Sequence, residues 1–168
     1  VEPKVEMTSA VQLIFVTCGT AVFANPRLLI DIQESAKALF TASFLSVDAI
    51  GSFNNVVSEF FVADHAQLVF DKIQNESEGQ FHISTEEIVQ EKNSNFKINT
   101  VTLDGGLVRN NINVSVIGEN CETHMNGAVI AKASMHVDNH TFVNHQVAHC
   151  FSNENYKYVL DEKSTGVF

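Results

Sequence analysis

Residues 107–117 read LVRNNINVSVI, and this stretch decides the fold class. Apolar and polar side chains alternate along it, with Val108, Ile112, Val114 and Val116 on one face and Arg109, Asn111, Asn113 and Ser115 on the other. A period of two residues is typical of a β-strand that buries one of its faces. The stretch therefore predicts a half-buried strand.

Similar short runs, rich in β-branched and aromatic residues, recur along the chain. They are Gln12–Thr17, Leu28–Ile32, Val56–Val62, Gln67–Phe70, Phe96–Leu103, Gly127–Lys132, His140–Val143 and Tyr156–Leu160. Between them lie residues that favour turns, namely Gly19, Asn25-Pro26, Gly51, Asn54-Asn55, Asn75, Gly79, Asp104-Gly105-Gly106, Gly118 and Asn126-Gly127. The pattern predicts an all-β chain, and no linker divides residues 1–168 into two domains.

Only one segment suggests a helix. Ser84 and Glu87 have the spacing of a capping box, but Ile88 and Val89 are the only apolar residues that follow, so a helix there would have little to bury. We predict strand or loop instead. Regularly spaced short strands are typical of a sandwich or barrel, and equally of a β-solenoid, in which each coil contributes short strands. Periodicity alone leaves these alternatives open.

The net charge of the chain argues against some classes of binding partner. Ten Lys and Arg residues face twenty Asp and Glu residues, which gives a formal net charge of −10. This sign argues against nucleic acid and against an anionic membrane surface as partners. The apolar stretch Val11–Phe23 is too short to span a bilayer and contains Gln12, Thr17 and Thr20, so we expect it to form core strands.

A set of ordered motifs lies in the last third of the chain. They are Gly118-Glu119-Asn120-Cys121, Met125-Asn126-Gly127, His136-Val137-Asp138-Asn139-His140-Thr141, Val143-Asn144-His145, Tyr156-Lys157-Tyr158-Val159-Leu160-Asp161 and Ser164-Thr165-Gly166-Val167-Phe168. Taken in this order, they resemble the SufB/SufD family of iron–sulfur cluster assembly scaffolds, and the SufD branch in particular. A looser likeness continues upstream to Pro26. One departure is Tyr158, where the family often has Gly, so the local turn geometry is open at that point.

The resemblance implies a right-handed parallel β-helix of short stacked strands. It implies that residues 1–168 are a single core segment, truncated relative to the family at the C-terminus and at the N-terminus. It further implies a cytoplasmic, non-catalytic scaffold that acts with a SufB-like subunit and a SufC-like ATPase, with a homodimer as a further option. Iron or an iron–sulfur cluster would then belong to the full complex, with no cofactor held firmly by this segment.

Candidate metal ligands gather between residues 136 and 150. They are His136, Asp138, His140, His145 and Cys150. On a strand, His136, Asp138 and His140 would point to one side and offer two imidazoles and a carboxylate, a set that suits iron or zinc. The alternative is structural: residues 138–140 would make the hydrogen bonds of a tight turn, and His145 would stack on a neighbouring coil.

The remaining reactive residues have no arrangement typical of catalysis. Cys18, Cys121 and Cys150 lack a Cys-x-x-Cys companion, so we expect buried, inert thiols. The adjacent Glu86 and Glu87 are expected on a solvated edge. A β-solenoid enzyme acting on carbohydrate, similar to the polysaccharide lyases, is the alternative function, but the chain has ten cations and no recurring Arg-Asp stripe.

Overall fold

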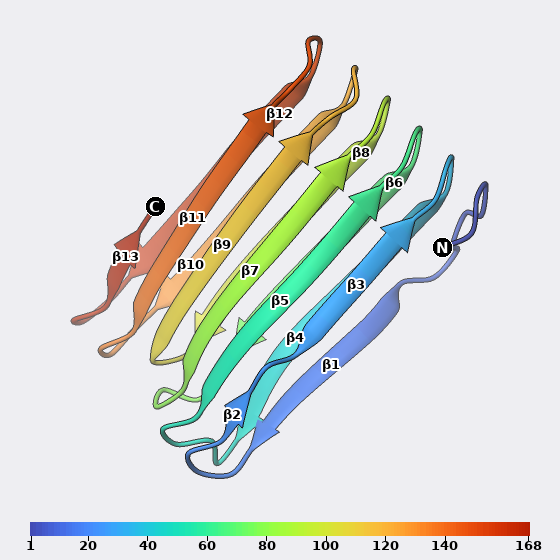
Figure 1. Ribbon diagram of the computed structural model, residues 1–168. Helices are drawn as coiled ribbons and strands as arrows, with labels where there is room; N and C mark the ends of the chain where they lie inside the picture. Colours follow the sequence, from blue (N-terminus) through green and yellow to red (C-terminus); the bar gives the residue numbers. More distant parts are fainter.

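The computed structural model describes all 168 residues and consists of thirteen strands joined by turns (Figure 1). The strands are β1 (Val11–Cys18), β2 (Phe23–Ala24), β3 (Arg27–Ile32), β4 (Lys37–Val47), β5 (Phe53–Val62), β6 (Gln67–Asn75), β7 (Phe81–Gln90), β8 (Asn95–Asp104), β9 (Leu107–Val116), β10 (Glu122–Ala131), β11 (His136–His145), β12 (Phe151–Leu160) and β13 (Thr165–Val167). No helix long and apolar enough to cross a membrane is present.

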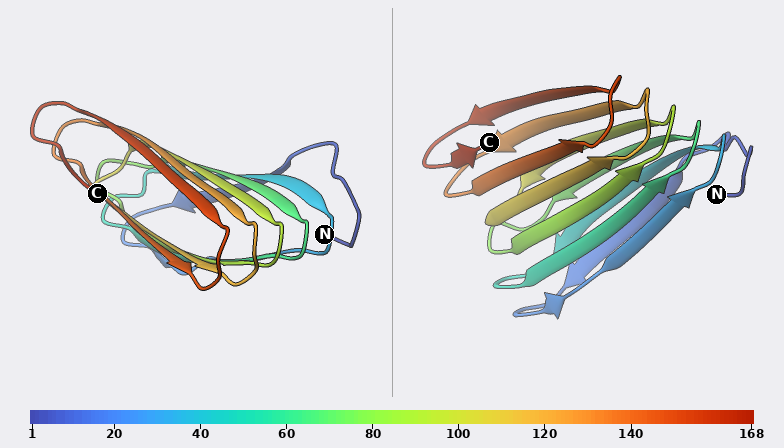
Figure 2. Two further views of the ribbon diagram at one scale, coloured as in Figure 1. Left: turned by 90° about the horizontal axis from the view of Figure 1, so that it is seen from above. Right: turned by 45° about the horizontal axis from the view of Figure 1, so that its top comes forward.

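The strands form two parallel sheets that face each other (Figure 2). One sheet has the order β1-β4-β6-β8-β10-β12, and the other has the order β13-β11-β9-β7-β5-β2, with β3 also paired to β5. From β3 onward, strands that follow one another along the chain alternate between the sheets, so each of these coils adds one strand to both. The predicted all-β solenoid of short stacked strands is confirmed, and the antiparallel pairing that a sandwich of hairpins would need is absent.

The register repeats with the coil. Lys37 pairs with Gln67, Gln67 with Asn95, Asn95 with Glu122 and Glu122 with Phe151, so one coil is 27–30 residues long. Because every strand between the two end coils hydrogen-bonds to the coil before and after it, the ladder satisfies the backbone without any hairpin. Only the first and last coils leave a strand edge unpaired.

One corner of each coil is a tight turn with a left-handed residue. Ser35, His65, Asn93, Asn120 and His149 all have φ near +60° and occupy the same corner in successive coils. Asn93 lies 3.2 Å from the His65 ring nitrogen, and Asn120 donates to the Asn93 side-chain oxygen at 3.2 Å. Asn tolerates this conformation better than most residues, and the side chains stack into a ladder along the corner.

The inward side chains of the two sheets fill the space between them. A cluster of 20 buried apolar residues includes Phe60, whose ring centroid lies 4.7 Å from that of Phe70 and 6.0 Å from that of Phe96. A smaller cluster of five residues surrounds Val108 and Val137. Polar side chains separate the two clusters, as described below.

Three sequence predictions about local structure are wrong. Asn54-Asn55 lies inside β5 and Asn126-Gly127 lies inside β10, and neither forms a turn. Asn54 is buried and hydrogen-bonded, and Gly127 leaves the space that the Tyr156 ring fills, because a Cβ there would lie 2.1 Å from a ring carbon. β1 forms as expected but is an edge strand, with Ile14 57% exposed, so Val11–Phe23 is only partly core.

Other local predictions are confirmed, but the strand β4 was not predicted. The segment from Ser84 onward continues β7 to Gln90, and the turn at residues 104–106 is present, with Gly105 at a φ of 154°. Tyr158 lies within β12 and causes no turn. β4 was missed altogether because its sequence, KALFTASFLSV, is rich in Ala, Ser and Thr and has no clear alternation.

Candidate functional site

The most unusual feature of the structure is a band of buried polar side chains across the solenoid interior, which we call the polar layer. Its centre is the coil formed by β6 and β7, and all of its members are at most 3% exposed. It consists of Asn54, Lys72, Gln74, Glu76, Gln80, His82, Ser84, Glu86, Thr100, Thr102, Asn110 and Asn139. Alternation on β6 and β7 turns these side chains inward, at positions that neighbouring coils fill with apolar residues such as Ala42 and Val56.

A fully buried ion pair lies at the centre of the polar layer. Lys72 on β6 donates to Glu86 on β7 at 2.6 Å and to the Ser84 hydroxyl at 2.6 Å. Both charged side chains are 1% exposed. Buried charges lose their hydration, so they are tolerated only when they are paired and hydrogen-bonded as these are.

From this ion pair a chain of hydrogen bonds runs toward the last coil. The Ser84 hydroxyl and the Gln74 amide both donate to the Asn110 side-chain oxygen, at 2.9 and 3.1 Å. Asn110 in turn donates to Asn139 at 2.8 Å. Asn139 donates to the Tyr158 hydroxyl at 2.6 Å, and that hydroxyl donates to the Val167 carbonyl at 2.9 Å. The chain therefore connects β7 to β13 through the interior.

A second group of buried polar side chains surrounds Glu76, which directly follows β6. Asn54 and Gln80 donate to the same Glu76 carboxylate oxygen, at 2.8 and 2.9 Å. The second Glu76 oxygen lies 2.7 Å from Nδ1 of His82, although the contact is not aligned as a hydrogen bond. The His82 ring also meets the edge of Phe44 at a centroid distance of 4.9 Å.

Some atoms of the polar layer have no hydrogen-bond partner. They are the second Glu76 carboxylate oxygen, the Gln80 side-chain oxygen, both ring nitrogens of His82 and the Thr100 hydroxyl. Outside the polar layer, the buried Tyr156 hydroxyl also has no partner. Buried polar atoms are normally paired, so these are the weakest points of the network. Burial also raises the pKa of Tyr156 far above its ordinary value, and repulsion from the nearby Glu154 and Glu86 adds to the shift.

The polar layer is closed to solvent. Of the four surface hollows, one of about 400 Å³ is lined by residues such as Asp31, Phe61 and Glu91, a second includes Thr100 in its lining, and none reaches Lys72 or His82. Without an opening, the layer has no route for a substrate. The polar layer can hold its protons and charges in fixed positions, and it can specify which coil packs next to which.

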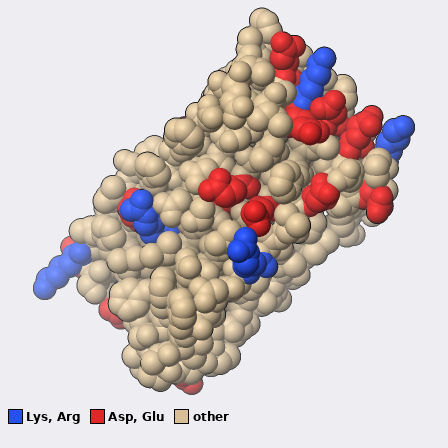
Figure 3. Space-filling model, viewed as in Figure 1, with Lys and Arg blue, Asp and Glu red and all other residues tan.

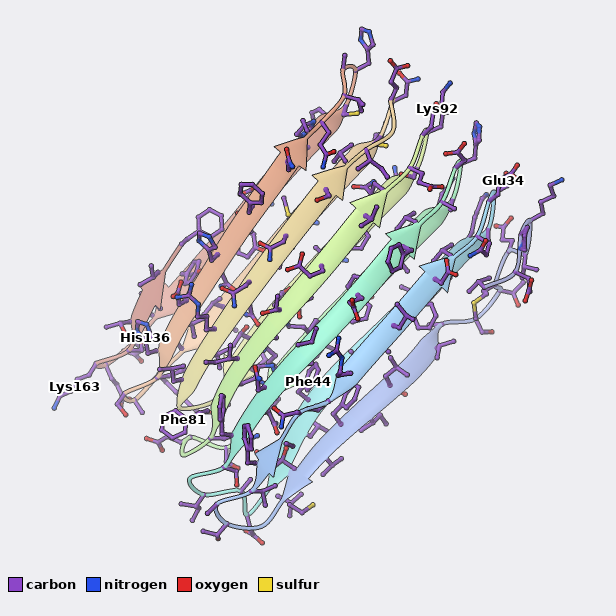
Figure 4. The ribbon with its side chains drawn as sticks, in the orientation of Figure 1. Glu34, Phe44, Phe81, Lys92, His136 and Lys163 are labelled. Carbon is purple, nitrogen blue, oxygen red and sulfur yellow. The ribbon has the colours of Figure 1, made fainter.

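The predicted metal ligands lie elsewhere, on the outer surface. His136 lies at the start of β11 (Figure 4), with Nδ1 2.6 Å from the Thr165 hydroxyl. Asp138 points outward from the same strand and accepts a hydrogen bond from Arg109 at 2.5 Å. His140 also lies on this face.

The strand brings His136, Asp138 and His140 to one side, as the alternation predicted. Nevertheless, no group of three or more His, Cys, Asp or Glu side chains in the molecule is placed to hold a metal ion. His145 contacts Ser152 at 3.1 Å, and Cys150 contacts the Gly118 carbonyl at 3.3 Å. The tight turn expected at 138–140 in the structural alternative is wrong, because these residues lie mid-strand and Asn139 points inward.

Two further expectations about reactive side chains are overturned. Glu86 does not lie on a solvated edge with Glu87, since it is buried against Lys72 while Glu87 faces outward. Cys18 is exposed rather than buried, because it ends the edge strand β1. Cys121 is buried as expected, and Cys150 is partly buried.

Sequence reasoning missed the polar layer. Lys72, Gln74 and Glu76 occur at alternate positions, as do His82, Ser84 and Glu86. This spacing could have shown that the three polar side chains of each strand share one face. A polar face is ordinarily assigned to solvent, so the pattern indicates the wrong side of the sheet unless the topology is known.

Together, the fold and the polar layer define a class of protein: a parallel β-solenoid with a closed, partly polar interior. The description "SUF system FeS cluster assembly, SufBD core domain" matches residues 15–168. The chain belongs to this family, whose role is iron–sulfur cluster assembly.

Two curated relatives support the assignment. An iron–sulfur cluster assembly SufBD family protein of Synechocystis is 27% identical over 97% of this chain and 38% of its own length. The protein ABCI7, chloroplastic, of Arabidopsis thaliana is 28% identical over 61% of this chain and 22% of its own length. The chain thus spans well under half of the curated relatives it matches. No solved structure matches significantly.

Proposed function

We propose that this protein is a non-catalytic scaffold subunit of the SUF machinery, in the SufD branch of its family. The observation that carries the proposal is the family match, which covers residues 15–168. The ordered motifs between Gly118 and Phe168 favour the SufD branch over the SufB branch. The partners we propose are a SufB-like subunit and a SufC-like ATPase, in the cytoplasm, with iron or a cluster as the cargo of the full complex.

The arrangement of the titratable groups supports a scaffold rather than an enzyme. In the closed interior, Lys72 is paired with Glu86, and the Glu76 carboxylate accepts hydrogen bonds from Asn54 and Gln80. On the outer surface, Arg109 is paired with Asp138, and Lys132 lies 3.2 Å from Asp104. No observation favours the carbohydrate-active alternative.

An exposed row of apolar side chains supports protein binding. Phe23, Phe53, Phe81 and Leu107 are aligned by the register of β2, β5, β7 and β9, and we call them the apolar row. Phe23 and Phe81 are 62% and 48% exposed. Phe81 projects from the start of β7 (Figure 4). Exposed apolar patches of this kind commonly mark protein interfaces.

The charges on the same face lie mostly away from the apolar row. Acidic side chains gather toward the end at which β3, β5 and β7 finish, and much of the remaining surface in this view carries no charge (Figure 3). A partner that contacts the apolar row therefore meets little charge, so few charged groups have to lose their hydration on binding.

The test is a co-purification of the full-length protein with its proposed partners. Co-expression with a SufB-like subunit and a SufC-like ATPase of the same organism should give a complex that survives gel filtration. Isolation of the protein alone, with both partners expressed and folded, would overturn the proposal. Turnover of a small-molecule or polysaccharide substrate by the isolated protein would overturn its non-catalytic part.

The role of the apolar row can be tested separately. Phe81→Lys should lower the recovery of the partners at least several-fold, because a charge would then be buried in the interface. A matched control is Ile130→Lys, since Ile130 is 54% exposed but points outward from the opposite sheet. Equal recovery with both variants would remove the apolar row from the interface.

A further inference from the structure

Two cysteines occupy the same corner of consecutive coils. Cys121 immediately precedes β10 and Cys150 immediately precedes β12, and these strands pair Glu122 with Phe151. The Phe151 amide donates to the Cys121 carbonyl at 2.9 Å. Cys121 and Cys150 are therefore direct neighbours across the parallel ladder.

The two thiols point into the same space. The Gly118 carbonyl accepts hydrogen bonds from both, at 3.0 Å from the Cys121 sulfur and 3.3 Å from the Cys150 sulfur. Neighbouring parallel strands lie about 4.8 Å apart. Disulfides join residues whose Cα atoms are about 4.4–6.8 Å apart, so the backbone spacing at this corner suits a disulfide.

The surroundings of the two thiols differ. Cys121 is 1% exposed, and burial raises its pKa, so that it is held as the neutral thiol among the carbonyls of Glu91 and Gly118. Cys150 is only partly buried. A dissolved reagent therefore meets Cys150 first, and Cys121 is placed to react in a second step.

We propose that Cys121 and Cys150 form an oxidation-sensitive dithiol, which closes to a disulfide between consecutive coils when the protein meets a small disulfide such as glutathione disulfide. The inference is independent of the proposed function, because it rests only on the position of the two thiols.

The reaction balances in two exchange steps. The Cys150 thiolate attacks one sulfur of the small disulfide, which forms a mixed disulfide and releases one small thiol. Cys121 then loses its proton and attacks the Cys150 sulfur, which releases the second small thiol. Two protein thiols are oxidised, and one small disulfide is reduced to two thiols.

The test is a cross-link analysis of the full-length protein. After incubation with glutathione disulfide and blocking of free thiols with N-ethylmaleimide, trypsin cleaves after Arg109, Lys132 and Lys157, so the two cysteines fall on separate peptides. We expect these peptides, residues 110–132 and 133–157, to be joined, with a mass two hydrogen atoms below their sum. Dithiothreitol should separate them.

Two results would overturn the inference. One is full alkylation of Cys121 and Cys150 under conditions that modify the exposed Cys18 completely. The other is stable glutathione on Cys150 with Cys121 still free. Because both results are read on the unaltered protein, they do not depend on whether a variant folds.

Variants sharpen the assignment of the two positions. Cys18→Ser should leave the cross-link unchanged, and its loss in this variant would contradict the pairing. Cys150→Ser should abolish the cross-link and leave Cys121 unmodified at neutral pH, because Cys121 is shielded from the reagent. Modification of Cys121 in a folded Cys150→Ser variant, verified by circular dichroism, would contradict the order of the two steps.

Discussion

Two regions of the solenoid interior share the same sheets but are filled in opposite ways. Around Phe60, Phe70 and Phe96, the inward side chains are apolar from coil to coil. Farther along the same strands, the polar layer places Lys72 against Glu86. The parallel backbone ladder is continuous through both regions. The ladder therefore defines the fold, while the interior can be apolar or polar provided that most polar groups are paired.

The two regions are expected to contribute differently to folding. Burial of apolar surface stabilises any compact arrangement, so the aromatic region tolerates related shapes. A buried ion pair contributes little net stability, but leaving one partner alone is strongly unfavourable. We therefore expect the polar layer to select one strand register among several. Substitutions in each region can separate its contribution to folding from that of the other.

The largest effect is expected at the ion pair. Lys72→Met leaves the Glu86 carboxylate buried without its partner, which should lower the free energy of unfolding by about 3–5 kcal/mol. Urea unfolding followed by circular dichroism measures the change. The control is the double variant Lys72→Met/Glu86→Leu, which removes both charges and should recover most of the loss. Additive losses in the double variant would mean that the two side chains act independently.

A smaller effect is expected at the hydrogen-bond hub. Asn110→Leu removes the hydrogen bonds that Asn110 makes with Gln74, Ser84 and Asn139, but each of these residues keeps another partner, so the expected loss is about 1–3 kcal/mol in total. Urea unfolding again gives the difference. The matched control is Asn113→Leu on the same strand, whose side chain faces outward and contacts only Glu87. Equal destabilisation by both variants would show that the strand, rather than the hub, responds.

The apolar region should respond more weakly to a conservative change. Ile88→Val deletes one methylene from a fully buried side chain, which typically costs about 0.5–1.5 kcal/mol. The thermal midpoint should fall by a few degrees without any broadening of the transition. The exposed Ile130→Val serves as the control and should leave the midpoint unchanged. A larger loss for Ile88→Val than for Lys72→Met would reverse the comparison of the two regions.

The smallest effect at neutral pH is expected for Tyr156→Phe, because the hydroxyl that it removes is buried without a hydrogen-bond partner. The pKa of Tyr156 is raised in the folded state, so above about pH 10 the unfolded chain releases this proton while the folded protein retains it. The unfolded state then binds fewer protons, and the stability of the wild type falls as the pH rises.

Tyr156→Phe should accordingly lose stability less steeply above about pH 10, by up to about 1.4 kcal/mol per pH unit. Thermal unfolding at pH 7 and across the alkaline range measures both effects. Tyr158→Phe is the contrasting variant, since its hydroxyl bonds Asn139 and Val167, and it should be destabilised at pH 7 as well. Identical alkaline profiles for wild type and Tyr156→Phe would contradict burial of this hydroxyl.

Much of the fold could be predicted from the sequence. Alternation in Leu107–Ile117 located β9 and its buried face correctly, because the inward residues of that strand are apolar except Asn110. The solenoid itself followed from a family resemblance, since short strands at regular spacing suit several all-β folds. β4 escaped prediction because small residues such as Ala38 and Ala42 fill the interior without a strong hydrophobic signal.

The candidate site could not be predicted in the same way. Alternation pairs Ser84 with Glu86 on one face, but it does not show that β6 lies across the interior with Lys72. That contact joins two sheets, and only the three-dimensional arrangement reveals it. Conversely, alternation correctly predicted that His136, Asp138 and His140 share one face, but it could not show whether their side chains converge on one point.

The separation of the buried apolar residues into two clusters also affects how the protein unfolds locally. The cluster of five residues around Val108 and Val137 is separated from the cluster of 20 by Asn110 and Asn139. Both clusters take side chains from β9 and β10, so the boundary between them crosses these strands rather than falling between two coils. We expect backbone amides flanking the smaller cluster to exchange with deuterium faster than those beside Phe60, which would make the polar layer a boundary between two units of local unfolding.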